Sequence, residues 1–357
     1  MSGNKRHSRR GFTLVEMLVT VTVIGIIVAM ALGALMNAQE TAREQRTRSL
    51  ISKLHTQIMF RWESYQTRRI PMKPIDLSSE TPAAYAAKRL QAQRELMRLE
   101  LPERWSDVTD PANPGDPVRL TPNLTEYPAL AESYLRRYNS NMVNGTPFQP
   151  TVEFEDAECL YMIITMGHDD AMSGTRLSAS DVADTDQDGM PEFVDGWRRP
   201  IRFLRWAPGF LAGPPYPWQS SPTAPPPGMN GNEDVAITDL QTGNWQDDHD
   251  PFDPLKLDSP GSAVLPAALS NDPWRGYRLT PLIYSMGSDG VGGIARADTG
   301  VTLDYSAMAP LPNDPYTKSA DSSGNPIDRM MGSPFDEGND GTYEHVDNIT
   351  NHALEVR

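Results

Sequence analysis

Residues 11–20, GFTLVEMLVT, begin an apolar run that continues to Met36. Between Phe12 and Met36 the only charged side chain is that of Glu16. A helix over this run would be roughly 37 Å long at about 1.5 Å per residue, enough to cross a hydrocarbon core of about 30 Å. We therefore predict a membrane-spanning helix. Its N-terminus is expected in the cytoplasm and the rest of the chain beyond the membrane, because the preceding residues include four basic side chains and no acid: Lys5, Arg6, Arg9 and Arg10.

Glu16 is the exception in the apolar run. A carboxylate inside hydrocarbon costs on the order of 2.5 kcal/mol or more, so such a residue marks a partner or a site by default. If the chain began at Phe12, the new ammonium group and the Glu16 carboxylate would lie about one helical turn apart. The helix dipole would also favour an acid at this end. The sequence therefore predicts a function for Glu16 at the start of the helix.

The basic leader, the string G-F-T-L-V-E-x-L-V and the uninterrupted apolar run resemble the cleavage and methylation motif of type IV prepilins and type II secretion pseudopilins. The resemblance implies cleavage between Gly11 and Phe12 by a membrane prepilin peptidase, followed by methylation of the Phe12 amine. It also implies that Glu16 pairs with the N-terminus of a sister subunit in a helical fibre built on an inner-membrane assembly platform. The protein would then cross the inner membrane once, with its head in the periplasm or outside the cell.

Two other interpretations of the N-terminus remain open. A secretory signal could end at residues 29–31, Ala-Met-Ala, which have the small-x-small form that a signal peptidase needs. The segment could also be a plain single-pass anchor. An acid within the apolar region is unfavourable in a secretory signal, and the GFTLVE string would then be accidental. The prepilin-like interpretation is therefore preferred.

Charge is divided unequally along the chain. Residues 1–70 contain 11 Lys and Arg against 4 Asp and Glu, whereas residues 71–357 contain 21 against 43. The exported part is strongly acidic, which argues against nucleic acid or an anionic membrane surface as its partner and is compatible with divalent cations. The single cysteine, Cys159, permits no intramolecular disulfide, so the exported part needs another way to stabilise its loops.

The long helix is expected to continue beyond the membrane. Residues 37–69 contain no Pro or Gly, and Pro71 is the first residue expected to end the helix. A separate amphipathic helix after a break near Asn37 is the alternative. In either case one apolar stripe would pack on a globular head, because apolar residues recur every four positions at Leu50, Leu54, Ile58 and Trp62.

The rest of the chain is predicted to combine an α-rich insert with a β-rich head. A helix is expected from an N-cap at Thr81 to Glu100, and another is expected to end near Asn139. Strands are expected over residues 159–166, 201–206 and 282–286, and the eight prolines of residues 207–228 indicate a loop.

The predicted fold class is α+β and pilin-like. A long N-terminal transmembrane helix packs on an antiparallel β-sheet head that carries a helical insert and long loops. The expected segments are a leader at 1–11, a transmembrane and stem helix at 12–70, the α-rich insert at 71–150 and the β-rich acidic head at 151–357.

The strongest candidate for a metal site lies in residues 184–195. With Asp184 as position one, acidic residues occupy positions one, three, five, nine and twelve, and Gly189 occupies position six, where a tight turn is needed. This spacing predicts a calcium loop without EF-hand helices, and Asp in place of Glu at position twelve should weaken it. A solvated acidic turn is the alternative. The candidate ligands are Asp184, Asp186, Asp188 and Asp195, with Glu192 at position nine.

A second candidate metal site is Asp289 with Asp298, around a glycine-rich turn. Two acids alone are a weak signal, because backbone carbonyls would have to supply most of the ligands. The order Asp-Pro-Trp, strand and Ser-Met-Gly-Ser-Asp-Gly in this region resembles the tail of major, G-type pseudopilins, in which such a loop is a calcium site. Calcium in either loop would order the head for assembly.

No string typical of a catalytic site occurs. The sequence lacks G-x-S-x-G, H-E-x-x-H and G-x-x-x-x-G-K-[ST], and Cys159 lies in an apolar run without a nearby base. We therefore expect a structural subunit of a type II secretion or type IV pilus-like assembly, and not an enzyme. The alternative is a membrane-anchored, calcium-stabilised binding protein or hydrolase that uses a pilin-like leader.

Overall fold

The structure is a computed structural model that divides into two compact units, Met1–Gln45 and Arg46–Arg357. The predicted leader and most of the proline-rich segment 207–228 lie outside the residues that it describes. The described residues are 13–74, 81–121, 123–140, 142–143, 146–147, 153–167, 177–208, 210, 250–258, 262, 275, 279–296, 314–316, 318–320, 326–332 and 347–352.

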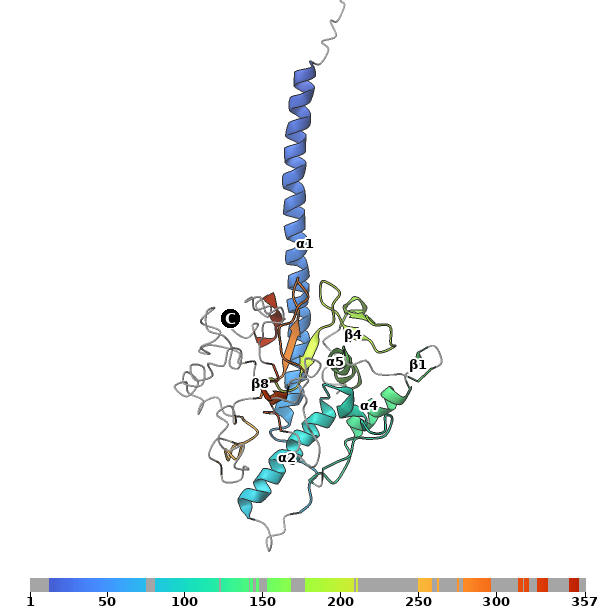
Figure 1. Cartoon of the computed structure of the whole chain (residues 1–357), viewed down its shortest axis with the longest axis vertical. Coiled ribbons are helices and arrows are strands. Elements are labelled where there is room, and N and C mark those ends of the chain that lie inside the picture. The colour runs from blue at the N-terminus through green and yellow to red at the C-terminus, as the bar shows by residue number, and fades with distance from the viewer. Residues whose placement is uncertain are drawn as a thin grey trace, which may run out of the picture. The chain divides into compact units, whose positions relative to one another are not determined.

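One uninterrupted helix, α1, runs from Leu14 to Ser64 (Figure 1). The predicted long helix is therefore confirmed, and no break occurs near Asn37. The first part of α1 is long and apolar enough to cross a membrane, and none of its most apolar section is buried by the rest of the protein. The helix ends before Pro71, as the sequence predicts.

The last turns of α1 belong to the head unit and contribute one side of its hydrophobic core. Leu54 and Ile58 are completely buried, and Leu50 and Trp62 are 3% exposed, so the predicted stripe packs on the head. The Trp62 ring meets the Phe252 ring edge-on, with centroids 4.6 Å apart. Burial of each such side chain stabilises the fold by about 1.5–3 kcal/mol.

Three helices lie in the described part of residues 71–150, which were predicted as an α-rich insert. Thr81 caps the first of them by accepting a hydrogen bond from the Ala84 N–H at 3.2 Å, and Pro82 is its first helical residue, as expected. The helices pack on one another. They are α2 (Pro82–Glu100), α3 (Trp105–Val108) and α4 (Ala129–Ser140).

The largest sheet among the described residues has three antiparallel strands in the order β5, β6, β9. They are β5 (Arg202–Leu204), β6 (Leu282–Ser285) and β9 (Ile349–Thr350), with Phe203 opposite Ile283 and Tyr284 opposite Thr350. Three two-stranded pairs accompany it: β1 (Met142–Val143) with β2 (Thr146–Pro147), β3 (Val182–Ala183) with β4 (Glu192–Phe193), and β7 (Lys318–Ala320) with β8 (Pro326–Met330).

The prediction of a strand over residues 159–166 is wrong. These residues belong to helix α5 (Glu155–Met166), which packs against β4 and β5 (Figure 1). The helix is buried over most of its surface, so its apolar residues show no 3.6-residue period, and a short apolar run can be either a buried strand or a buried helix. Three acids in the first turn, Glu155, Asp156 and Glu158, suit the positive end of a helix dipole.

Strand β5 lies within the predicted strand 201–206, in which apolar and basic residues alternate, but its basic side chains do not face solvent. Arg202 is only 3% exposed, and Arg205, which follows the strand, is completely buried. Both guanidinium groups are ion-paired inside the head. Arg202 contacts Asp156 at 2.6 Å, and Arg205 contacts Asp107 at 3.0 Å. Because the arginines find buried acids, the alternating pattern does not separate a buried face from a solvated one.

Candidate functional site

Helix α1 begins with a reciprocal pair of hydrogen bonds between Thr13 and Glu16. The Glu16 N–H donates to Thr13 Oγ1 at 3.3 Å, and the Thr13 N–H donates to Glu16 Oε2 at 3.4 Å. This arrangement is a capping box, which satisfies N–H groups that the first helical turn leaves without an intrahelical partner. Glu16 therefore also starts the helix, a role that the pattern T-x-x-E would have indicated. Gly11 and Phe12, the predicted processing residues, lie outside the described residues.

The apolar part of α1 presents a continuous apolar surface. Every residue from Leu14 to Met36 is exposed. The hydroxyl groups of Thr20 and Thr22 do not interrupt this surface with unsatisfied donors, because they donate to backbone carbonyls of the preceding turn, each at 2.8 Å. A surface of this kind needs lipid or apolar partners around it, and its polar groups are satisfied within the helix.

The acidic loop predicted to bind a metal joins the two strands of a β-hairpin. Residues 184–191 connect β3 to β4, which pair antiparallel. One carboxylate oxygen each of Asp184, Asp186 and Asp188 lies within 4.8 Å of the other two. Gly189 has φ 96°, the left-handed conformation expected for the tight turn at position six, and its N–H donates to Asp184 Oδ2 at 3.1 Å.

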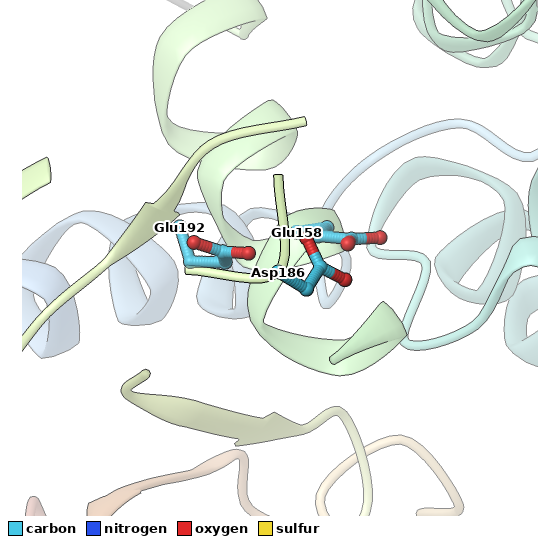
Figure 2. A group of neighbouring side chains, drawn as sticks. All are labelled: Glu158, Asp186 and Glu192. Atoms are coloured by element: carbon cyan, nitrogen blue, oxygen red, sulfur yellow. The ribbon is translucent and has the colours of Figure 1, made fainter. Parts of the chain in front are cut away.

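A further carboxylate reaches this loop from helix α5. One oxygen each of Glu158, Asp186 and Glu192 lies within 4.8 Å of the other two, and Figure 2 shows these three side chains gathered between α5 and the hairpin. Glu158 and Glu192 are completely buried. Neither oxygen of Glu158 has a hydrogen-bond partner among the described residues. In Glu192, Oε1 also lacks one, whereas Oε2 accepts from the Thr185 N–H at 3.0 Å.

Burial and mutual repulsion disturb the ionisation of these acids. Burial, and after it the carboxylates of Asp188, Asp186 and Glu192, raises the pKa of Glu158 to about 10. Burial likewise raises the pKa of Glu192 to about 7, with the neighbouring aspartates adding to the effect. The pKa of Asp188 is raised for the same two reasons, burial first. The cluster therefore concentrates more negative charge than the surrounding protein stabilises.

Asp195, predicted as the twelfth-position ligand, lies outside both acidic groups. Its buried carboxylate accepts from the Ser285 hydroxyl at 2.6 Å and from the N–H groups of Trp197 and Arg199 at 2.8 and 2.9 Å. These bonds fix the turn before β5 and join it to β6. The structure thus bonds Asp195 to protein donors, and Glu192, at position nine, is the residue after the turn that reaches the aspartates.

In the second candidate loop the structure describes Asp289 but not its predicted partner, Asp298. Asp289 is exposed, and its Oδ1 accepts from the Val291 N–H at 2.9 Å. Asp298 lies outside the described residues, so the pairing of these two acids stays a prediction. Asp347 instead lies near Asp289, and burial, together with that neighbouring charge, raises the pKa of Asp347.

Glu158 is the site residue that the sequence analysis missed. It precedes the loop by 26 positions and comes directly before residues 159–166, which were interpreted as a strand. The available signal was an acid at the start of an apolar run, which is consistent with a helix first turn. That signal indicates a helix but does not reveal which loop the acid faces.

A long helix with an exposed apolar surface and an antiparallel α+β head define a pilin-like fold. Residues 6–32 match the family model described as the prokaryotic N-terminal methylation motif. The chain thus has the N-terminus of a prepilin-like, membrane-anchored protein, and the match ends before the head. Comparison with curated proteins and with solved structures finds no match.

Proposed function

We propose that the chain is a structural subunit of a helical fibre in a type II secretion or type IV pilus-like machine. The methylation-motif match at residues 6–32, on a helix that continues unbroken into the head, is the observation that supports this function most. A prepilin peptidase would cut between Gly11 and Phe12. The mature chain would cross the inner membrane once, with its head exported, and would be drawn by an assembly platform into a fibre of sister subunits.

The structure suggests how Glu16 would take part in assembly. In the single chain its carboxylate accepts only a long hydrogen bond, 3.4 Å, from the Thr13 N–H among the described residues. The Phe12 ammonium of a neighbouring processed subunit would be a charged donor, and charge-assisted hydrogen bonds are roughly twice as strong as neutral ones. Inside a membrane or a fibre core this gain would be larger still, because the dielectric constant is low. The exchange of partners would set the register between subunits.

Cys159 also favours a structural function over a catalytic one. The thiol is completely buried in α5. Burial, with the neighbouring acids Glu155 and Glu158, raises its pKa well above the ordinary value. A thiol that stays protonated and has no solvent access is a poor nucleophile.

The first test is mass spectrometry of the N-terminal peptide of the protein purified from membranes. We expect N-methylphenylalanine derived from Phe12. A chain that begins at Met1 or at Leu32 would contradict the proposal, because neither places an amine one turn from Glu16.

The second test compares Glu16→Ala with Glu63→Ala, an exposed acid on the same helix. Both variants should be processed, but only Glu16→Ala should fail to enter fibres, as measured by shearing and sedimentation. If the protein were instead an anchored binding protein or hydrolase, the unmutated chain would form no fibres and the Glu16 change would alter nothing in this assay.

A further inference from the structure

Two trios of carboxylates in the head share Asp186. Asp184, Asp186 and Asp188 form one trio, and Glu158, Asp186 and Glu192 form the other, with the chosen oxygens of each trio within 4.8 Å of one another. Oxygens bound to one calcium ion at about 2.3–2.6 Å lie up to about 5 Å apart. Both trios therefore have the spacing of a single coordination shell, and the shared residue joins them.

Glu158 is an independent sign of a ligand, because it comes from α5 and not from the acidic loop. It is completely buried, its carboxylate lies beside that of Asp186 (Figure 2), and neither of its oxygens has a hydrogen-bond partner among the described residues. A buried carboxylate without hydrogen bonds is strongly unfavourable unless a proton or a cation neutralises it.

We propose that Glu158, Asp184, Asp186, Asp188 and Glu192 bind one divalent cation of the calcium type. All five donors are carboxylates, which suit a hard cation and not a metal that prefers nitrogen or sulfur. The hairpin loop supplies three of them from a tight turn, and two more come from the rigid elements β4 and α5. The twelfth-position residue Asp195 is not among the proposed ligands, because it belongs to neither trio and its carboxylate instead joins the turn before β5 to Ser285.

The cation would act as a cross-link between α5 and the β3–β4 hairpin. A ligand that binds the native state and not the unfolded chain stabilises the native state in proportion to the logarithm of its concentration. This role replaces the disulfide that a chain with the single Cys159 lacks. The site does not depend on the proposed function, because all of its residues lie in the head unit.

The experiment is thermal unfolding of the full-length chain in detergent micelles, first with a chelator and then with increasing calcium chloride. The midpoint of unfolding should rise by about 5 °C or more at saturation. Isothermal titration calorimetry of the chelated chain should give about one ion per chain, since the two trios share a residue.

Glu158→Gln removes a charge and keeps the size of the side chain. It should weaken calcium binding by about tenfold or more, because calcium affinity follows the charge and number of ligands. Glu192→Gln is the second variant and should show the same loss. Asp195→Asn and Asp289→Asn are the controls, and both should keep the calcium affinity of the unmutated chain. Cooperative unfolding of each variant in chelator shows that it is folded.

A calcium-independent midpoint in the unmutated chain would overturn the proposal. Unchanged calcium affinity in both Glu158→Gln and Glu192→Gln would do the same. Loss of binding in Asp289→Asn alone would assign the ion to the other loop. None of these outcomes bears on fibre assembly, so failure here is distinguishable from failure of the proposed function.

Discussion

Two groups of buried acids in the head differ in the charges that surround them. Next to α2 and α3, Arg98 and Arg205 donate to the two oxygens of Asp107 at 2.9 and 3.0 Å. Burial alone would raise the pKa of Asp107, but the nearby arginines outweigh it and the pKa is lowered. At Glu158 the same burial meets only further carboxylates, and the pKa rises to about 10. Between Asp107 and Glu158 the sign of the pKa shift therefore depends on the neighbouring charges, whereas at Asp250 and Asp314 burial outweighs the paired arginines and the pKa is raised.

The arginine-paired acids extend into a second network that joins distant parts of the chain. Arg94, on α2, contacts Asp250 at 3.1 Å and Asp258 at 2.6 Å. Arg275 in turn contacts Asp258 and Asp314. A guanidinium group is part of the chain and is always present, whereas a metal ion is exchangeable. The arginine-paired acids therefore carry their counter-charges within the chain, whereas the acids around Glu158 would depend on the proposed cation.

Breaking the arginine region should have the largest effect. Arg205 is completely buried, and its Nη1 also donates to the Leu101 carbonyl at 2.8 Å. Arg205→Met leaves Asp107 with one fewer cation, and removing one partner of a buried ion pair costs about 3–5 kcal/mol. Urea unfolding of the solubilised chain, followed by tryptophan fluorescence in excess calcium, measures the loss. The matched control is Arg136→Met, because Arg136 is 71% exposed and lies 3.9 Å from Glu132. Its loss should stay below about 1 kcal/mol.

Glu155 is intermediate between Asp107 and Glu158, because it accepts one hydrogen bond but has a raised pKa. It should make the stability of the protein depend on pH. Its Oε2 accepts from the Trp105 N–H at 3.0 Å, but burial raises its pKa to about 8 against 4.5 for an ordinary glutamate. The native state therefore holds this proton to higher pH than the unfolded chain does. The stabilisation is complete below about pH 4.5 and is lost as the pH rises through about 8. At about 1.4 kcal/mol per pKa unit, up to about 4 kcal/mol should disappear between about pH 5 and pH 8.

Glu155→Gln isolates this contribution, because the amide oxygen still accepts from the Trp105 N–H. The variant should lose less stability than the unmutated chain over the same pH range, in chelator and at constant ionic strength. Identical pH profiles for the two chains would show that Glu155 is already ionised in the native state, as Asp107 is.

The same acid-to-amide change should have opposite signs in the two regions. In chelator near pH 7, Glu158 is protonated in the native state but ionised in the unfolded chain, because burial raises its pKa to about 10. Glu158→Gln removes the cost of taking up that proton, so the free energy of unfolding should rise by about 1–2 kcal/mol. Asp107→Asn removes the negative charge that faces two buried guanidinium groups, so the free energy of unfolding of this variant should fall. Both are measured by urea unfolding. A loss of stability in both variants would mean that the native protein stabilises the Glu158 carboxylate as it does that of Asp107. The two regions would then not differ.

The sequence predicts most of the helical structure and part of the acidic site. The apolar stripe of α1 and the Thr81 cap of α2 depend on residues that are close in sequence, so the sequence alone is enough to predict them. Spacing within one turn likewise brings Asp184, Asp186 and Asp188 together. By contrast, α5 is buried over most of its surface, so no periodicity distinguishes it from a strand.

Two further misses arise from tertiary contacts. Arg205 fits the pattern of an exposed basic residue, and only the packing of α3 against the end of β5 places Asp107 beside it. Glu158 joins the acidic loop because α5 packs on β4. In both cases the partner is remote in sequence, so the pattern reports the residue type but not its neighbour.

The smallest effect should come from Arg46 on α1. This residue tests whether the contribution of an arginine–aspartate pair to stability depends on its burial and not on its charge alone. Arg46 Nη2 donates to Asp181 Oδ1 at 2.6 Å and to the Ser180 carbonyl at 2.7 Å, geometry as good as that of Arg205, but its side chain is 42% exposed. Arg46→Met should therefore cost less than about 1 kcal/mol, and the cost should shrink further in 1 M salt because exposed pairs are screened. The loss in Arg205→Met should be insensitive to salt. A salt-independent loss of several kcal/mol for Arg46→Met would mean that water access does not weaken these pairs, and the difference between the two acidic regions would need another cause.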